Sequence, residues 1–332
     1  KGEWKPELSL KVVAQRLSEL LGKEVLMAAD VVGEDAKAKA ASLKDGDVML
    51  LENVRYIKGE TKNDPELSKE LASLADLFVN DAFGTAHRAQ ASTEGAIRKA
   101  KVACAGPLMK GELDAFAKVL DNPKRPLVAI IGGSKVSTKL GLLDNLLGRV
   151  DRLIIGGGIA NTFLAATGHP VGKSLYEPDL IDASKEILAK AEKLGKPIPL
   201  PVDVVTAPEL APGQKAVTCG VDEVASDQMI LDIGPKTVAL YEEILNKAAT
   251  IVWNGPVGAF ETDPFGAGTR ALAEALAKCG GFVVVGGGDS VSAVESYGLA
   301  DKMGYISTGG GAFLELFEGK KLPAVAALED RA

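Results

Sequence analysis

The chain has 332 residues, of which 46% are hydrophobic and 25% charged, and its net charge is −7. This length favours two domains, and the composition is that of an ordinary soluble globular protein. The acidic balance argues against a general nucleic-acid binder. No apolar run approaches the ~20 residues of a membrane span, and we recognise neither a signal peptide nor a cysteine framework for zinc or disulfides. We therefore expect a cytoplasmic protein without nucleic-acid or membrane partners.

The first third of the chain contains one helical pattern and two strand-like runs. Apolar residues at helical spacing predict an amphipathic helix over residues 8–21. Its apolar face consists of Leu10, Val13, Leu17, Leu20 and Leu21. Strands are predicted over residues 48–51 and 74–79, and each is followed by polar residues.

A second helical pattern covers residues 108–120 and is closed by Asp121-Asn122-Pro123. We interpret this helix and its exit as the junction between two domains. The alternative is one more surface helix.

The second half repeats an apolar run followed by a glycine-rich exit five times. In an open parallel sheet the carboxyl ends of the strands share one edge, where ligands bind. The sequence therefore predicts α/β architecture with a mostly parallel sheet and a single crevice lined by backbone N–H groups. The runs cover residues 127–131, 153–155, 250–253, 282–285 and 305–307.

The segment Gly132-Gly133-Ser134-Lys135-Val136-Ser137-Thr138-Lys139 follows one of these runs and is expected to open a helix. A helix start presents free N–H groups and attracts phosphate. Lys135 and Lys139, four residues apart, are expected on one face of its first turns, where a bound polyanion offsets their charge. The alternative is two solvated lysines. The segment is not a Walker A loop.

The segment Gly286-Gly287-Gly288-Asp289-Ser290 also follows a strand and precedes a helical pattern. Asp289 fits two interpretations, an ordinary helix cap and a magnesium ligand beside a nucleotide. None of the GGG runs fits the GxGxxG fingerprint with its downstream acid, which argues against a nicotinamide enzyme.

In the first half, Arg55 and Arg88 each follow a predicted strand. Two guanidinium groups at strand exits suit a small phosphorylated acid, although each fits a solvated or ion-paired arginine as well. The two histidines have no acid or nucleophile at a telling spacing, and no G-x-S-x-G elbow is present. This pattern favours direct in-line transfer over covalent catalysis.

Seven stretches, in order from about residue 50 to the C-terminus, resemble the phosphoglycerate kinase family. They are LLENVRY, NDAFGTAHRAQAST, IIGGSKVSTK, IIGGGIANTFLAA, VWNGPVGAFE, VVGGGDS and ISTGGGAFLE. The resemblance implies two Rossmann-like domains, each a mostly parallel sheet flanked by helices, that close about a helical hinge. It places a 3-phosphoglycerate domain at residues 1–107 plus 322–332, the hinge at 108–124 and a nucleotide domain at 125–321.

The resemblance also implies the roles of individual residues. Arg55 and Arg88 would contact the phosphoglycerate, and Asp289 would hold Mg²⁺ beside ADP or ATP. Glu261 resembles the carboxylate that holds the ribose hydroxyls. The residues expected to act on the transferring group are Lys135, Lys139, Gly287 and Gly310, the last within the glycine-rich helix start at 309–311. The remaining nucleotide contacts are expected from Gly156, Gly157, Asn254, Gly255, Pro256, Gly288 and Ser290.

The chain departs from the family at its start. The family opens with a strand bearing Val-Asp-Phe-Asn, then a basic residue and His-Leu-Gly-Arg-Pro, and this chain begins at what resembles the residue after that proline. We therefore expect that several dozen residues, including much of the acid-substrate site, are absent from it.

The leading hypothesis is reversible phosphoryl transfer between 1,3-bisphosphoglycerate and ADP, giving 3-phosphoglycerate and ATP, by a monomer whose cleft closes about its hinge. A second hypothesis is a truncated nucleotide-binding module that binds magnesium ADP without turnover. A Rossmann oxidoreductase is the third.

Overall fold

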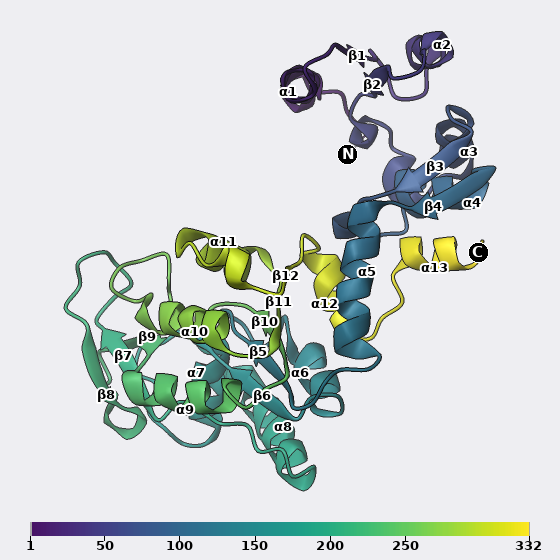
Figure 1. The fold of residues 1–332 in the computed structure, drawn as a ribbon. Coiled ribbons are helices and arrows are strands. Elements are labelled where there is room, and N and C mark those ends of the chain that lie inside the picture. Colours follow the sequence, from purple (N-terminus) through teal and green to yellow (C-terminus); the bar gives the residue numbers. More distant parts are fainter. Residues whose placement is uncertain (1, 332) are drawn as a thin grey trace. The chain divides into compact units, whose positions relative to one another are not determined.

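The computed structural model describes residues 2–331, which form two compact units (Figure 1). Unit 1 extends to Gly111 and resumes at Lys321, and unit 2 spans Glu112–Lys320. The helix α5, Pro107–Leu120, crosses the first of these boundaries. Its bounds agree with the helix expected over residues 108–120. No helix among residues 2–331 is both long and apolar enough to cross a membrane.

Unit 2 is built on a five-stranded parallel sheet in the order β12-β11-β10-β5-β6. Its strands correspond to the five apolar runs with glycine-rich exits, so that prediction is confirmed. Because the strands are parallel, all five exits lie at the same edge of the sheet. In chain order the strands are β5 Leu127–Ile131, β6 Arg152–Ile155, β10 Thr250–Asn254, β11 Phe282–Val285 and β12 Tyr305–Ile306.

Helices follow the strands of this sheet, as expected for an α/β unit. Alternate residues of β5, β10 and β11 belong to one buried core cluster with Tyr241 of α9 and Leu272 of α10. Trp253 of β10 is fully buried in this cluster. The helices of unit 2 after α5 are α6 Leu140–Leu147, α7 Gly157–Ala166, α8 Ile181–Lys193, α9 Pro235–Leu245, α10 Ala267–Lys278, α11 Gly288–Ser296 and α12 Gly311–Phe317.

Unit 2 also contains a three-stranded antiparallel sheet that the sequence did not indicate. Its order is β8-β7-β9, with β7 Asp203–Ala207 in the centre, flanked by β8 Val217–Gly220 and β9 Met229–Ile233. The carboxylate of Asp203 is 3% exposed and accepts hydrogen bonds from Lys236 N at 3.0 Å and from Thr237 N and Oγ1, both at 2.7 Å. Asp203 therefore caps the start of α9, where backbone N–H groups have no partner within the helix.

Unit 1 has two separate two-stranded parallel sheets, β1-β2 and β3-β4, where a single sheet was expected. The strand expected over 74–79 begins at Leu77, because Leu74 is the C-cap of the preceding helix α3. The strands are β1 Val25–Met27, β2 Val48–Leu50, β3 Leu77–Asn80 and β4 Val102–Ala105, and the helices are α1 Lys11–Leu21, α2 Glu34–Ser42, α3 Pro65–Ser73, α4 Ala96–Lys99 and α13 Pro323–Glu329.

The apolar face predicted for the first helix is mostly exposed. The helix α1 begins at Lys11, after a 3₁₀ turn over Pro6–Leu8, and of its residues only Ala14 is buried. Val13, Leu20 and Leu21 are 45%, 67% and 46% exposed. The helical period was therefore right, but the described residues do not cover the face that it defines.

The Asp203 cap generates a prediction about stability. Replacing Asp203 by Ala leaves the buried donors of Lys236 and Thr237 without their partner, so we expect the free energy of unfolding of unit 2 to fall by about 3 kcal/mol. Asp203→Asn keeps one acceptor oxygen and should lose less. Urea unfolding followed by Trp253 fluorescence, in a Trp4→Phe background, measures the change.

Asp182→Ala, at an exposed ion pair of α8, is the matched control and should change the same free energy by less than about 0.5 kcal/mol. If Asp203→Ala behaved like this control, the cap would have no structural importance.

Candidate functional site

Backbone hydrogen bonds tie the glycine-rich exits of unit 2 to one another. Gly132 N donates to Asn254 O at 2.8 Å, and Gly133 N donates to Pro256 O at 3.1 Å. Gly156 N donates to Ile131 O at 3.0 Å, and Gly286 N donates to Trp253 O at 2.9 Å. The exits of β5, β6, β10 and β11 therefore form one connected surface at the edge of the sheet.

Close approach of these backbones requires glycine at particular positions. Gly255 has φ of +95°, and a Cβ there would lie 2.2 Å from Gly132 O. Gly157 has φ of +63°, and a Cβ there would lie 2.6 Å from Gly133 O. Both positions combine left-handed backbone with no space for a side chain, which only glycine satisfies.

The two candidate lysines lie in different environments. The segment after β5 is a loop, and α6 begins only at Leu140 with Lys139 as its N-cap. The expectation that Lys135 and Lys139 share one helical face was therefore wrong. The loop is fixed by a residue distant in the sequence, since Ser137 N and Oγ donate to the Glu177 carboxylate at 2.9 and 2.5 Å. Lys135 is exposed in this loop.

The Lys139 ammonium lies against the glycine exits. Its Nζ donates to Gly132 O at 3.2 Å and to Asn254 Oδ1. A Cβ on Gly133 would lie 3.9 Å from Lys139 Nζ. Burial lowers the pKa of Lys139 to about 8, and the nearby Asp289 carboxylate partly offsets this effect.

Asn254 joins three strand exits through its amide side chain, which is 2% exposed. While its Oδ1 accepts from Lys139 of the β5 loop, its Nδ2 donates to Gly286 O after β11 at 2.8 Å. Gly287 has φ of +93°, and a Cβ there would lie 2.6 Å from this Nδ2. Nearby, the fully buried Ser290 Oγ accepts from Gly255 N at 2.5 Å. The contacts of Asn254 and Ser290, with glycine required at position 287, therefore connect the exits of β5, β10 and β11.

The helices α7 and α11 begin without a side-chain cap. Their N-cap residues are Gly156 and Gly287, and neither start receives a capping hydrogen bond from the N-cap side chain. At α7, however, Gly157 N donates to Val257 O at 3.1 Å and Ile159 N donates to Gly133 O at 3.2 Å, so two of its first N–H groups already have partners. At α11, glycine leaves the first N–H groups available, and the helix dipole adds positive potential there. Gly157 and Gly288 are the first residues of the two helices.

Asp289 lies exposed in the first turn of α11 and lines the cavity described below. No group of three or more His, Cys, Asp or Glu side chains with metal-site geometry occurs among residues 2–331. One carboxylate fits Mg²⁺, because this ion keeps several waters and shares phosphate oxygens of a nucleotide rather than taking an all-protein cage.

A cavity of about 530 Å³ opens beside these exits in unit 2. Of the predicted site residues, Gly157, Pro256, Glu261 and Asp289 line it. Gly156, Asn254, Gly255, Ser290, Lys139, Gly287 and Gly288 belong to the edge described above, whereas Lys135 is exposed outside the lining.

An apolar part of the cavity lining was missed by the sequence. It includes Met229 and Leu231 of β9, together with Leu175, Leu210 and Phe260. These apolar side chains suit the flat face of a nucleobase. The only sequence signal was the apolar run before Gly234-Pro235, which resembles any buried strand.

Asp232 is a buried carboxylate in the lining of this cavity and is 2% exposed. It accepts hydrogen bonds from Gly268 N at 2.7 Å and Ile233 N at 2.9 Å, so it caps the start of α10. Burial raises its pKa to about 7, although these two N–H groups favour the charged form.

The third glycine run leads into α12 at the end of the sheet. Gly310, the N-cap of α12, has φ of +46° and lies outside the cavity lining. The preceding segment is held by the fully buried Glu112 carboxylate, which accepts from Ser307 Oγ at 2.8 Å and Thr308 N at 2.7 Å. The role expected of Gly310 stays a prediction.

In unit 1, Gln90 connects the side chain of Arg55 with the segment that carries Arg88. Arg55 lies in the 3₁₀ turn Val54–Tyr56 after β2, and its Nη2 donates to Gln90 Oε1 at 3.1 Å. Arg88 lies two residues before Gln90 and is exposed, with its Nε 3.2 Å from His87 Nε2. The Arg55 guanidinium therefore contacts the buried Gln90 amide, and Arg88 is linked to the same residue through the chain.

Comparison with known proteins gives matches over the whole chain. The family model of phosphoglycerate kinase matches residues 1–320. The phosphoglycerate kinase of Desulfovibrio desulfuricans is 65% identical over 331 residues, which cover 100% of this chain and 83% of that protein. The phosphoglycerate kinase of Nitratidesulfovibrio vulgaris is 56% identical with the same coverage.

Solved structures agree with these sequence matches. The structure of phosphoglycerate kinase from Coxiella burnetii matches with a TM-score of 0.93 at 50% identity, covering 100% of this chain and 84% of its own. Phosphoglycerate kinase from Pyrococcus horikoshii matches with a TM-score of 0.84 at 35% identity, covering 97% and 82%. With the glycine-rich edge, the adjoining cavity and the arginine pair in place, these matches show that the chain belongs to the phosphoglycerate kinase family.

Proposed function

We propose that this chain catalyses the glycolytic transfer of a phosphoryl group from 1,3-bisphosphoglycerate to ADP, giving 3-phosphoglycerate and ATP, in either direction. The observation that supports this most directly is the Lys139 ammonium, placed against the glycine exits and electrostatically coupled to Asp289. A cation, an open helix start and a single carboxylate are the parts that phosphoryl transfer to a nucleotide requires. Family membership decides against the oxidoreductase alternative.

The nucleotide is proposed to occupy the cavity of unit 2. Its base would contact the apolar wall of β9, and Glu261 would accept hydrogen bonds from the ribose hydroxyls. Its phosphates would extend to the start of α11, whose first N–H groups and dipole favour anions, while the start of α7 borders the cavity through Gly157 and Gly158. When bound with the nucleotide, Mg²⁺ supplies charge neutralisation at the phosphate oxygens, and Asp289 is the residue that would hold it.

Lys139 is proposed to follow the transferring phosphoryl group. Its charge is partly desolvated, so an ion pair with phosphate is stronger here than at an exposed lysine. Lys135, being exposed in the loop, would contribute attraction over a longer range. The contributions of Gly287 and Gly310 would come from their backbones.

The acid substrate is proposed to bind to Arg55 and Arg88 of unit 1. A guanidinium group presents a planar fork that matches both carboxylate and phosphate oxygens. Gln90 orients the Arg55 fork and leaves its other donors available. In-line transfer with closure about the hinge, and a monomeric state, stay predictions.

Removing the Lys139 ammonium tests the proposed catalytic role. We expect Lys139→Ala to lower kcat by about 10²–10³-fold, while the Kd for magnesium ADP rises by less than about tenfold, because the charge acts mainly on the transition state. Steady-state kinetics and calorimetric titration with ADP, magnesium and NAD measure the two effects. Lys185→Ala, on the exposed face of α8, is the matched control and should change neither.

Equal losses of turnover and ADP binding would refute this role for Lys139. Tight binding of magnesium ADP by the parent chain without any turnover would favour the nucleotide-binding module instead.

The lowered pKa of Lys139 predicts a pH dependence of nucleotide binding. Bound phosphates favour the ammonium form, so binding should take up a proton at about pH 9 and weaken as the pH rises through about 8. Calorimetry in two buffers of different ionisation enthalpy measures the uptake. Lys139→Arg should abolish it, because the guanidinium stays charged at this pH.

Asp232 lines the same cavity and has a pKa of about 7, so it titrates at lower pH and stays ionised over the range in which Lys139 titrates. Proton uptake that persisted in Lys139→Arg would therefore assign the titration to another group and contradict the prediction.

A further inference from the structure

The arginine pair of unit 1 is held by a π-helical turn over Ala91–Gly95. Gln90, the N-cap of this turn, accepts from Arg55 Nη2 at 3.1 Å, and Thr93 Oγ1 donates to Arg88 O at 2.8 Å. The turn therefore fixes the side chain of one arginine and the backbone of the other. Single π-helical turns are rare and occur frequently at functional sites.

On one side the turn is anchored by a buried carboxylate. Glu60 is 1% exposed, and its two oxygens accept from Ser92 N at 2.9 Å and Ser92 Oγ at 2.6 Å. Asn63, the only residue other than glycine with positive φ among residues 2–331, donates from Nδ2 to Glu94. These contacts hold the turn against the segment that leads into α3.

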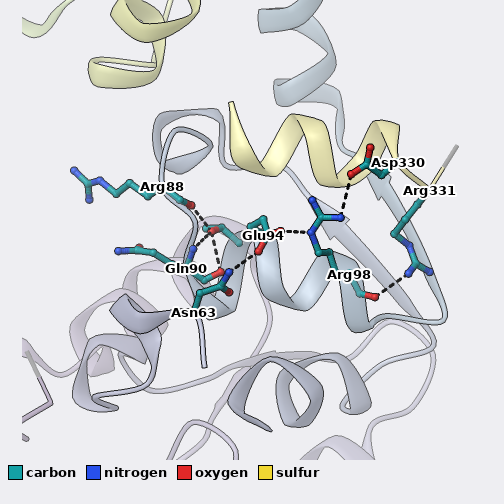
Figure 2. A network of polar contacts seen from close by, with 8 residues as sticks. Asn63, Arg88, Gln90, Glu94, Arg98, Asp330 and Arg331 are labelled. Carbon is teal, nitrogen blue, oxygen red and sulfur yellow. Dashed lines mark hydrogen bonds and ion pairs between the residues drawn. The ribbon is translucent and has the colours of Figure 1, made fainter. Parts of the chain in front are cut away.

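On the other side the turn is connected to the end of the chain through Arg98 (Figure 2). Arg98 Nε donates to the Glu94 carboxylate, while Arg98 Nη1 lies 3.1 Å from Asp330 Oδ2. Only 12% of the Glu94 side chain is exposed, so its charge depends on Arg98 and Asn63 for compensation. One guanidinium thus bridges the π-helical turn and the segment after α13.

The segment around α13 makes further contacts with the same region. Arg331 Nη1 donates to Arg98 O at 3.0 Å and its Nη2 donates to Ala100 O at 2.6 Å, which satisfies carbonyl groups at the end of α4. At the other end of α13, Ala324 N donates to Ala86 O at 3.1 Å, two residues before Arg88. Ala324 and Ala327 are fully buried, and α13 contacts both α4 and the π-helical turn.

Figure 2 shows that the side chains of Arg88 and Gln90 extend in one direction, away from this network. The network itself runs from the turn through Glu94 and Arg98 to Asp330. Glu94 and Thr93 belong to the same five-residue turn, which Gln90 caps, so we expect a shift of Glu94 to displace both Thr93 and Gln90.

We propose that Arg98 is a positioning residue for the acid substrate. By linking Glu94 to Asp330, it holds the π-helical turn and so keeps Arg55 and Arg88 in the arrangement that binds 3-phosphoglycerate. This inference rests on the proposed function of the arginine pair.

The first experiment compares substrate binding by single variants. We expect Arg98→Ala to weaken 3-phosphoglycerate binding by about fivefold and Asp330→Asn by about twofold, with ADP binding unchanged, as for an ion-pair network at a partly exposed site. Arg98→Lys keeps the charge but not the fork, and should fall between Arg98→Ala and the parent chain. Arg16→Ala, at the exposed Arg16–Glu19 pair of α1, is the matched control and should change nothing.

The second experiment asks whether Arg98 acts through the turn. In a Gln90→Ala background the connection from the turn to Arg55 is already broken, so Arg98→Ala should weaken acid binding by less than in the parent chain. A general loss of structure would weaken acid and ADP binding together and would add fully to Gln90→Ala. That result would overturn the inference.

The third experiment does not depend on the substrate. In the ligand-free chain, amide hydrogen exchange over Ala91–Gly95 should become faster in Arg98→Ala and stay unchanged in Arg16→Ala. Unchanged exchange in Arg98→Ala would overturn the positioning role even if the parent chain binds 3-phosphoglycerate. Failure of the parent chain to bind the acid, with faster exchange in Arg98→Ala, would instead refute the site proposed for Arg55 and Arg88.

Discussion

The side chain of Asn254 makes the contacts on which the rest of the glycine-rich edge of unit 2 depends. Asn254 is the last residue of β10, the central strand of the five-stranded sheet, and is almost completely buried. Its backbone oxygen accepts from Gly132, its Oδ1 accepts from Lys139 and its Nδ2 donates to Gly286 O. Because an amide has both a donor and an acceptor, one residue can hold a lysine on one side and a backbone carbonyl on the other. An aspartate in place of Asn254 would accept from Lys139, but its second oxygen would face Gly286 O, and two negatively polarised oxygens repel each other.

This arrangement requires glycine around Asn254 for steric reasons. A Cβ at Gly287 would collide with the Asn254 amide, and a Cβ at Gly255 would collide with Gly132 O. The glycines therefore serve the contacts between strand exits as well as access to a ligand. Backbone hydrogen bonds connect four exits in this way, and under the proposed function this connection would keep reorganisation small when charge develops in a transition state.

The sequence predicted those parts of the fold that depend on local signals. Each strand of the large sheet is an apolar run followed by glycine, and both signals lie within a few residues of one another. The start of α6 was misjudged because the loop before it is fixed by Glu177, some 40 residues away in the chain. The wall formed by Met229 and Leu231 was missed for a similar reason, since an apolar strand gives no sign of facing a cavity. The connection of Arg98 to Asp330 is likewise visible only in three dimensions, across 232 positions.

Lys139 illustrates how a site for anions can exist in a chain of net charge −7. Burial lowers its pKa from 10.5 to about 8, so the unfolded chain binds more protons than the folded chain between these values. The folded state is therefore less stable when Lys139 is charged, and its stability rises as the pH increases across this interval. A bound phosphate reverses the preference, because it supplies the countercharge that water no longer provides. At the site proposed for the transferring phosphoryl group, the free energy that burial of this charge costs the ligand-free fold would therefore strengthen binding of that group.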